Sequence, residues 1–211
     1  GDGMDDVVIM VQGPNLFNGG PELLYVATSM PNGTFDVEYA PTGTYFGYEV
    51  KLADYDGDQD LDAVVSDYNG DRVVGLRNDG SGHFLLSDTL IASINGCDDL
   101  ELVDLDGDGD LDLAAAAWQG SDVLLALNDG TGQFSAPIEL TETGSRCEAL
   151  VVEDLNQDGL LDVAACFENS GDLRVWLRTG AMQEMAFASP QILTLQSAQD
   201  VQGSDVDGDG H

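Results

Sequence analysis

Nine residues from Asp104 to Asp112, DLDGDGDLD, place aspartates where their side chains can act together. The carboxylates at the first, third, fifth and ninth positions converge if the backbone curls tightly, and Gly109 at the sixth position suits the left-handed conformation of such a curl. Four carboxylates this close repel one another unless a cation lies between them. A hard divalent ion with flexible oxygen coordination fits best, so the stretch predicts a Ca²⁺ site to which the seventh residue adds its backbone carbonyl.

The stretch recurs at a constant period. Complete copies begin at Asp54, Asp104 and Asp154, 50 residues apart, and half-motifs lie at Asp2–Asp6 and from Asp205 to the chain end. A phased series of this kind indicates a repeat protein. The alternative interpretation is a set of acidic, glycine-rich hairpin turns that hold no metal, and a phased series makes it the weaker one.

Two other calcium-binding folds do not fit the pattern. An EF-hand closes its loop with a bidentate Glu at position twelve, where this chain has Val65, Ala115 and Ala165. The nonapeptide period of a calcium-binding β-roll would repeat far more densely than every 50 residues. The ninth-position Asp must therefore close each site, and the flanking residues read as strands.

The sequence of each complete repeat predicts four short strands. In the first repeat they are Val50–Ala53, Leu61–Ser66, Arg72–Leu76 and Leu86–Ile91. In the second they are Leu100–Val103, Leu111–Trp118, Asp122–Leu127 and Ile138–Thr141, and in the third Leu150–Glu153, Leu161–Phe167, Asp172–Leu177 and Ile192–Leu195. Ala114–Ala117 alone would favour a helix, but the corresponding Val-rich segments of the other repeats overrule that, because repeats share structure.

The two ends of the chain hold complementary parts of a repeat. Val7–Val11, Glu22–Thr28 and Phe35–Tyr39 supply a second, third and fourth strand, and Gln199–Ser204 supplies a first strand. We therefore divide this single repeat region into a partial blade at 1–44, blades at about 45–95, 96–145 and 146–197, and a partial first strand with its calcium loop at 198–211. Four-stranded units of this length, arrayed radially, predict an all-β β-propeller with about four blades' worth of chain. The sequence leaves open whether these blades close a ring by themselves or belong to a larger ring or assembly. Because unpaired strand edges are rarely left exposed, we expect the partial blades to be completed within one chain, between chains, or by a longer parent chain.

The whole pattern resembles a known family. A strand, Asp-x-Asp-Gly-Asp-Gly-x-x-Asp, an apolar strand and then Asn-Asp-Gly-x-Gly-x-Phe, as in the run from Asn128 to Phe134, is similar to the FG-GAP/VCBS repeat. Phe46-Gly47 stands where the Phe-Gly of that name usually falls, whereas the other units have Gly96-Cys97 and Arg146-Cys147 there. The resemblance implies a propeller with Ca²⁺ bound between the first two strands of each blade, and an adhesive or scaffolding role more often than catalysis.

Carried over residue by residue, the resemblance gives a set of metal ligands. The side-chain ligands are Asp54, Asp56, Asp58 and Asp62; Asp104, Asp106, Asp108 and Asp112; and Asp154, Asn156, Asp158 and Asp162. Asp60, Asp110 and Leu160 would contribute backbone carbonyls, and Asp205, Asp207 and Asp209 belong to the carboxyl-terminal half-motif. Two departures matter: Gln59 replaces the sixth-position Gly, and Asn156 with Gln157 leaves the third loop with one anionic ligand fewer, so that we expect it to bind the ion most weakly.

The amino-acid composition limits which partners the protein can bind and where it is located. The net charge is −34 with only six basic residues, which excludes nucleic acid as a partner class. No apolar run approaches the ~18 residues that a membrane-spanning helix needs. Calcium sites of weak to moderate affinity fill where the ion is abundant, so we expect an extracellular or cell-surface location, with the periplasm as an alternative. Cys97, Cys147 and Cys166 allow a disulfide in an oxidising compartment, but the sequence does not assign one.

Two functions remain open. The first is a non-enzymatic, calcium-stabilised module that binds a glycan or a protein, or assembles with copies of itself. The second is a propeller within a polysaccharide lyase or hydrolase, although His83 has no catalytic neighbours in the sequence. Tyr68 and Trp118 occupy the same repeat position, where they either stack on sugar rings or pack between blades, the second being the stronger expectation.

Overall fold

The computed structural model describes residues 5–11, 22–44, 46–120, 122–141, 146–181, 184–195 and 198–204. Over these residues the fold is all-β, with strands, turns and no helix. No helix that is long and apolar enough to cross a membrane occurs among them.

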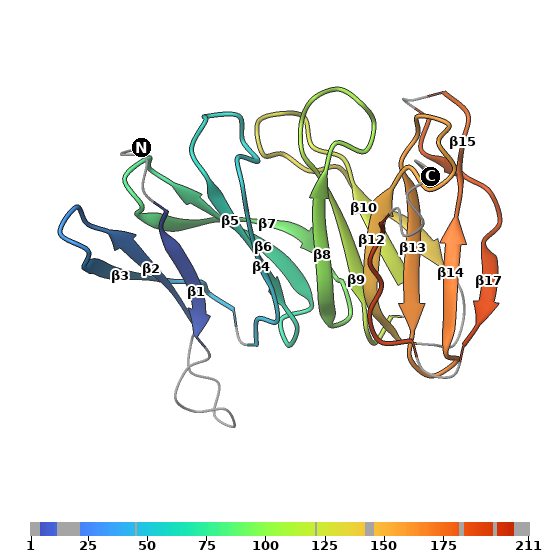
Figure 1. Ribbon diagram of the computed structural model, residues 1–211, viewed down its shortest axis with the longest axis horizontal. Coiled ribbons are helices and arrows are strands. Elements are labelled where there is room, and N and C mark those ends of the chain that lie inside the picture. The colour runs from blue at the N-terminus through green and yellow to red at the C-terminus, as the bar shows by residue number, and fades with distance from the viewer. Residues whose placement is uncertain are drawn as a thin grey trace.

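The strands form four main antiparallel sheets (Figure 1). The first sheet holds β1 (Val7–Val11), β2 (Leu23–Ser29) and β3 (Phe35–Pro41), and the second holds β4 (Val50–Ala53), β5 (Asp62–Asp67), β6 (Arg72–Asn78) and β7 (Phe84–Ala92). The third sheet holds β8 (Cys97–Val103), β9 (Asp112–Ala117), β10 (Asp122–Ala126) and β11 (Ile138–Thr141). The fourth sheet holds β12 (Cys147–Glu153), β13 (Asp162–Phe167), β14 (Asp172–Trp176) and β17 (Gln191–Thr194).

The second strand of each complete sheet is buried on both faces. Every residue of β5, β9 and β13 is buried. A continuous apolar run bounded by turns is typical of such a strand, and this explains why the four alanines from Ala114 to Ala117 lie in a strand despite their helical propensity. Small side chains at these positions let a neighbouring sheet approach closely on either side.

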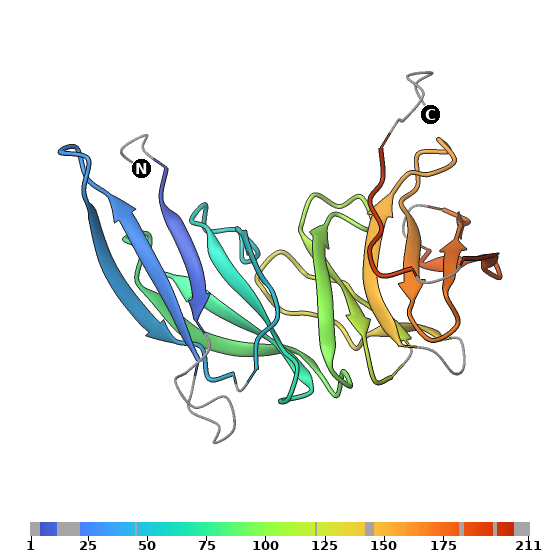
Figure 2. The ribbon, with the colours of Figure 1, turned by 60° about the horizontal axis from the view of Figure 1, so that its bottom comes forward.

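The sheets pack face to face in a row, which Figure 2 shows from the side. One apolar core joins the first and second sheets through Leu24, Val26, Val65 and Leu76. A second core joins the second and third sheets, and a third core joins the third and fourth. Each complete sheet is therefore a four-stranded blade of a β-propeller, and the blades follow one another in chain order.

The first strands of neighbouring blades are tied to each other. The backbone N–H of Leu100 in β8 donates to Glu49 Oε2, just before β4, at 3.0 Å. One blade later, the N–H of Leu150 in β12 donates to Asp99 Oδ2 in β8 at 2.8 Å. Glu49 and Asp99 hold the same repeat position, so the same contact is made at two successive junctions.

The structure corrects one expectation about strands and adds one hairpin. Gln199–Ser204, which we expected to form a first strand, forms none. They lie instead against the fourth sheet, where Cys166 Sγ contacts the carbonyl oxygen of Asp200 at 3.4 Å. In the third repeat a short hairpin of β15 (Arg178–Thr179) and β16 (Ala186–Phe187) replaces the Asn-Asp-Gly turn of the other repeats, because the sequence RTGAMQEMAF lacks that turn's residues.

The partial blades are not joined to each other in the part of the chain that the structure describes. In the described residues β1 pairs only with β2, and Val201 pairs with no strand. β1 and the residues up to 204 lie at opposite ends of the row of sheets in both views (Figures 1 and 2). Closure of a four-bladed ring by this chain alone is thus not what the structure shows.

Candidate metal centres and the surface beside them

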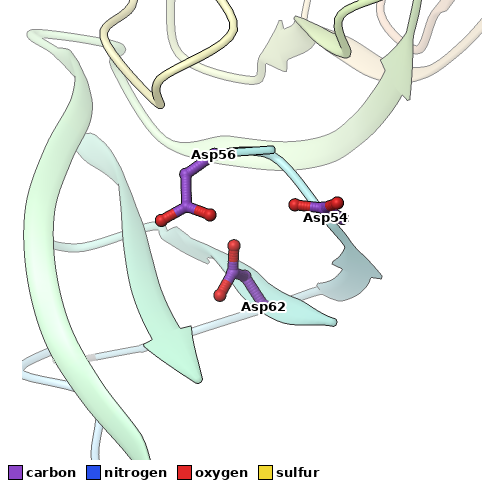
Figure 3. Close-up of side chains that lie close together, drawn as sticks. All are labelled: Asp54, Asp56 and Asp62. Carbon is purple, nitrogen blue, oxygen red and sulfur yellow. The ribbon is translucent and has the colours of Figure 1, made fainter. Parts of the chain in front are cut away.

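Three Asp-rich loops connect the first and second strands of the complete blades. We call them loop 1 (Asp54–Asp62), loop 2 (Asp104–Asp112) and loop 3 (Asp154–Asp162). In loop 1, carboxylate oxygens of Asp54, Asp56 and Asp62 lie within 4.8 Å of one another, and Figure 3 shows them around a common space. In loop 2, Asp104, Asp106 and Asp108 meet the same criterion.

The loops fold because their first aspartate binds the backbone that follows it. Asp54 accepts hydrogen bonds from the N–H groups of Gly57 (2.8 Å) and Gln59 (2.9 Å). Asp104 accepts the equivalent bonds from Gly107 and Gly109, and Asp154 accepts one from Gly159. These bonds curl the chain around the carboxylates without the help of an ion, and they therefore pre-organise an oxygen-lined site.

The curl needs the left-handed backbone conformation at two positions of each loop. The fourth position has φ of 79° at Gly57, 80° at Gly107 and 60° at Gln157. The sixth has φ of 77° at Gln59 and 99° at Gly109. Sequence reasoning identified the demand at the sixth position and missed it at the fourth. A residue other than Gly there costs about 1–2 kcal/mol, so loops 1 and 3 each carry one strained glutamine.

The ninth-position aspartates are buried at the start of the second strand. Asp62, Asp112 and Asp162 are each 0% exposed. One oxygen of each accepts a backbone N–H from the end of the third strand or just beyond it, from Asn78 (2.8 Å), Asn128 (2.7 Å) and Arg178 (2.8 Å) respectively. Burial raises the pKa of Asp62 and of Asp112 to about 6. These carboxyls are therefore costly to ionise unless a cation lies beside them.

Loop 3 differs from the other two in its donors. Asn156 stands at the third position, and its side-chain amide donates to Asp158 Oδ2 at 3.1 Å. The counterpart of Asp158 in loop 2, Asp108, belongs to the cluster of carboxylates there. In the described residues no group of three clustered acids is found in loop 3, in contrast to loops 1 and 2.

The structure places the other residues that we expected to be ligands as follows. Asp58, Asp158 and Asn156 are exposed, and Asp60, Asp110 and Leu160 are half-buried at the seventh positions. The side chains of Asp60 and Asp110 lie against Gly80 and Gly130, where a Cβ atom would collide with them. Asp205, Asp207 and Asp209 lie outside the described residues.

Loops 1 and 2 are also fastened to the next blade, a feature that the sequence did not reveal. The side-chain amide of Asn128 donates to the carbonyl of Tyr55, the second residue of loop 1, at 2.7 Å. The guanidinium of Arg178 donates to the carbonyl of Leu105, the second residue of loop 2. Tyr55 and Leu105 are each 1% exposed within the core that joins their blade to the next one. Loop conformation and blade packing are therefore coupled.

A basic side chain already approaches loop 1. Arg77 Nη1 lies 2.6 Å from Asp56 Oδ2, while its Nη2 donates to the carbonyl of Thr131 in the next blade at 3.1 Å. The guanidinium thus balances part of the loop's charge and adds a second tie between this loop and the following blade.

Tyr48, Tyr68 and Trp118 form a row of aromatic side chains. Tyr68 and Trp118 lie in the turns between the second and third strands of their blades, and Tyr48 precedes β4. Ring centroids are 5.3 Å apart for Tyr48 and Tyr68 and 5.6 Å apart for Tyr68 and Trp118, so the row crosses from one blade to the next. The Arg146 guanidinium lies 3.8 Å from the centre of the Trp118 ring and extends the row to a third blade. Tyr68 and Trp118 are half-buried and pack between blades, while Tyr48 is 56% exposed.

Carboxylates lie alongside this aromatic row. The Glu148 carboxylate is hydrogen-bonded to the Trp118 side chain, and Glu168 pairs with Arg146 at 3.3 Å. Burial, followed by repulsion from Glu148, raises the pKa of Asp98 to about 6. Flat rings and polar acceptors therefore occupy one surface across three blades.

The other candidate residues have ordinary surroundings. Cys97, Cys147 and Cys166 are buried free thiols, and burial raises the pKa of each. His83 is exposed, with Nε2 3.0 Å from Glu38 and Nδ1 3.4 Å from Asp79. No hydroxyl or thiol nucleophile is bonded to this imidazole in the described residues.

The loop geometry agrees with a comparison of the chain with protein-family models. The model of the FG-GAP-like repeat matches three times, at residues 54–115, 104–165 and 154–211. The chain belongs to the FG-GAP-like repeat family. Each match begins at the first aspartate of a loop, so the FG-GAP-like unit runs from one loop into the next. No curated protein matches the chain.

Two solved structures align with most of this chain. An Agrocybe aegerita lectin, described as recognising non-reducing terminal N-acetylglucosamine, aligns with a TM-score of 0.53 at 20% sequence identity. The alignment covers 88% of this chain and 51% of the lectin chain, so this FG-GAP-like chain spans about half the length of that protein. The Tc holotoxin pore of Photorhabdus luminescens aligns at 20% identity with a TM-score of 0.43, over 90% of this chain and 9% of that one. At this identity the lectin likeness supports the β-propeller fold alone.

Proposed function

We propose that this FG-GAP-like propeller is a calcium-stabilised, non-enzymatic module that acts outside the cell or at its surface by binding a glycan or a protein. The observation that carries the proposal is the convergence of aspartate oxygens in equivalent loops of consecutive blades. Adhesive and scaffolding roles are common for FG-GAP-like repeats, which is why we place the module in adhesion or structural assembly.

The residues of loops 1 and 2 fit a calcium ion. All their donors are oxygens, which hard cations prefer, and the three free cysteines lie elsewhere in the core. The Asp62 carboxylate is buried beside those of Asp54 and Asp56, so a cation among them would offset the cost of ionising it. A bound Ca²⁺ would supply the positive charge that allows Asp62 and Asp112 to stay ionised. Asp54, Asp56, Asp58 and Asp62 would hold it in loop 1, with the matching residues in loop 2.

The aromatic row is the surface that we assign to the ligand. Tyr48 exposes a ring that can cover an apolar sugar face. Asp98 lies near this ring, and Glu168 lies near Asp98, so both carboxylates can accept hydrogen bonds from hydroxyl groups. We infer a glycan as the first ligand class to test by analogy with the lectin of similar fold, which is described as recognising non-reducing terminal N-acetylglucosamine. A protein segment with exposed hydroxyl or amide groups would use the same features.

The test combines calcium binding with ligand screening. Calorimetric titration of the metal-free chain should show calcium bound at loops 1 and 2, and a glycan array probed in calcium should show binding that Tyr48→Ala abolishes. Tyr39→Ala, which removes an equally exposed ring from the first sheet, is the matched control and should leave binding intact. The proposal fails if no calcium binds, if both variants behave alike, or if the chain depolymerises a polysaccharide.

A further inference from the structure

The side chain of Arg77 joins loop 1 to the following blade. Arg77 is the penultimate residue of β6, and its Nη1 lies 2.6 Å from Asp56 Oδ2. Its Nη2 donates to the carbonyl of Thr131 in the next blade at 3.1 Å, and its guanidinium carbon lies 5.9 Å from the centre of the Tyr55 ring. The Asp56 side chain is only 6% exposed. Water therefore screens this ion pair less than it screens a pair on the open surface.

The two oxygens of Asp56 have different partners. Its Oδ1 accepts the backbone N–H of Asp58 at 3.3 Å, just as Asp106 Oδ1 in loop 2 accepts the N–H of Asp108 at 3.2 Å. This oxygen therefore takes part in the curl of the loop itself. The second oxygen is the one that the curl leaves to an ion, and in loop 1 it is the oxygen that Arg77 contacts.

The same carboxylate also belongs to the metal centre. Carboxylate oxygens of Asp56, Asp54 and Asp62 lie within 4.8 Å of one another around a common space (Figure 3). A calcium ion takes its oxygen ligands at about 2.3–2.6 Å, so an ion bound to Asp56 Oδ2 would lie close to the guanidinium. Two cations at one oxygen repel each other. Calcium and Arg77 therefore compete for Asp56.

This ion pair is specific to loop 1 among the three complete loops. Leu127 and Leu177 occupy the position of Arg77 in the next two repeats, so the same pair cannot form there. A different guanidinium, that of Arg178, lies near Asp106 in loop 2. It comes from the following blade, and it donates to the carbonyl of Leu105. The competition is thus a property of Arg77 and not of the repeat.

We propose that Arg77 sets the calcium affinity of loop 1 by acting as a built-in cation that calcium must displace from Asp56. The inference rests on the calcium binding proposed above. Without calcium, Arg77 neutralises Asp56 and ties loop 1 to Thr131 in the next blade. When calcium binds, the guanidinium leaves Asp56, so loop 1 fills at a higher calcium concentration than it would with leucine at this position. Loop 1 then responds to changes in calcium that a tighter site would not register.

Arg77→Leu tests the proposal, because it gives loop 1 the residue of the other two repeats. Calcium should bind loop 1 of this variant about tenfold more tightly, since the ion no longer displaces a hydrogen bond between charged groups. The direction of the change is decisive. A residue that only supported the loop would weaken calcium binding when it is removed, whereas a competing cation strengthens it.

Terbium luminescence reports binding at loop 1 separately from the other loops. Terbium replaces calcium at oxygen sites and emits when a nearby tyrosine is excited. Tyr55 is the second residue of loop 1, where loops 2 and 3 have Leu105 and Leu155. The part of the emission that Tyr55→Leu removes therefore belongs to loop 1. Titration of calcium against bound terbium then gives the calcium Kd of this loop in the wild type and in Arg77→Leu.

Arg72→Leu is the matched control. Arg72 lies at the other end of β6, pairs with Asp67 at 2.9 Å and donates to the carbonyl of Gly43 in the preceding blade at 2.7 Å. Its removal changes the net charge as much as Arg77→Leu does and also breaks a tie between blades. It should leave the calcium affinity of loop 1 unchanged. Arg77→Lys keeps the positive charge and should stay close to the wild type.

The other outcomes overturn the proposal. An unchanged or weaker calcium affinity of loop 1 in Arg77→Leu would show that Arg77 does not compete with the ion. An equal gain in Arg72→Leu would assign the effect to net charge alone. In both cases calcium still binds, so the proposed function stands. If neither terbium nor calcium binds loop 1 in the wild type or in Arg77→Leu, both this inference and calcium binding at that loop are wrong.

Discussion

At the scale of single residues, the buried ninth-position aspartate has both a structural and a metal-binding role. Asp112 accepts N–H groups from Asn128 through one oxygen and from Leu105 through the other, at 2.8 Å. Asp112→Asn would turn an NH₂ group toward one of these donors and leave a buried donor unsatisfied, which costs about 1–3 kcal/mol. We expect that loss of unfolding free energy even without metal, measured by urea denaturation in a metal-free buffer.

Asp108→Asn is the matched control for this prediction. Asp108 is exposed and accepts the N–H of Asp110 at 3.0 Å, which an asparagine oxygen also accepts. Both variants should weaken calcium binding at loop 2, but only Asp112→Asn should lower the stability of the metal-free chain. Equal stability of the two metal-free variants would show that Asp112 acts as a ligand alone.

The raised pKa of the buried aspartates predicts an unusual pH dependence. The pKa of Asp62 and of Asp112 is about 6 in the metal-free folded chain, against an ordinary value of 3.8. The folded state therefore binds protons that the unfolded state has released, and its stability falls as pH rises through about 6. We expect a higher melting temperature at pH 5 than at pH 7.5 in metal-free buffer, measured by circular dichroism. The reverse order would contradict the assignment.

The neutral residue Asn156 in loop 3 leads us to predict a substitution that strengthens calcium binding instead of weakening it. Asn156 removes one anionic oxygen and donates its amide to Asp158. Asn156→Asp should free that oxygen, add a charge and tighten calcium binding at loop 3, because more anionic ligands give higher affinity. Calorimetric titration of the variant checks this, and an unchanged affinity would show that the ligand count does not limit this loop.

At the scale of elements, the contact between a loop and the following blade couples the conformation of the loop to the packing of the blades. The side-chain amide of Asn128 donates to the carbonyl of Tyr55 in the preceding blade and to that of Leu111 in its own. In the described residues the side-chain amide of Asn78 donates only to the carbonyl of Leu61 in its own blade. Asn128→Ala should therefore lower stability by about 1–3 kcal/mol and also weaken calcium binding at loop 1. Asn78→Ala should do neither to the same extent. Urea denaturation and calcium titration of both variants decide the matter.

The elements were predictable from the sequence where the repeats agree and unpredictable where they differ. The alternation of loop and apolar run located β5, β9 and β13, and the comparison between repeats placed Ala114–Ala117 in a strand. The hairpin β15–β16 could not be foreseen, because it occurs in one repeat only and has no counterpart to compare. Residues 199–204 have strand-like composition, but a strand needs a partner, and the described chain offers none.

The candidate site was predictable in its residue types and unpredictable in its connections. The period of the aspartates located the loops, because metal ligands of one loop are close in sequence. The ties from Asn128 to Tyr55 and from Arg178 to Leu105 join residues 73 positions apart, so no local pattern could reveal them. Asn128 itself reads as the start of an Asn-Asp-Gly turn, which conceals its second role between blades.

At the scale of the whole molecule, charge and packing act against each other. The chain carries a net charge of −34, and nearly half of its 40 acidic residues lie in the loops and half-motifs. Loops 1 and 2 place their second residues in the cores that join the blades, so repulsion within a loop acts directly on those cores. Calcium in the loops would relieve that repulsion where the blades meet.

We therefore expect removal of calcium to destabilise the whole row of blades. Binding to the folded state alone contributes about 2.7 kcal/mol per site at a hundredfold excess over Kd, so two sites should raise the melting temperature by roughly 10–20 °C for a chain of this size. Differential scanning calorimetry with EGTA and with calcium checks this. NaCl and MgCl₂ at matched ionic strength are the controls, because screening alone also eases repulsion in so acidic a chain. A melting temperature that responds equally to all three salts would mean that the loops need only a cation atmosphere, since a bound ion acts through the geometry of its ligands and a screening ion does not.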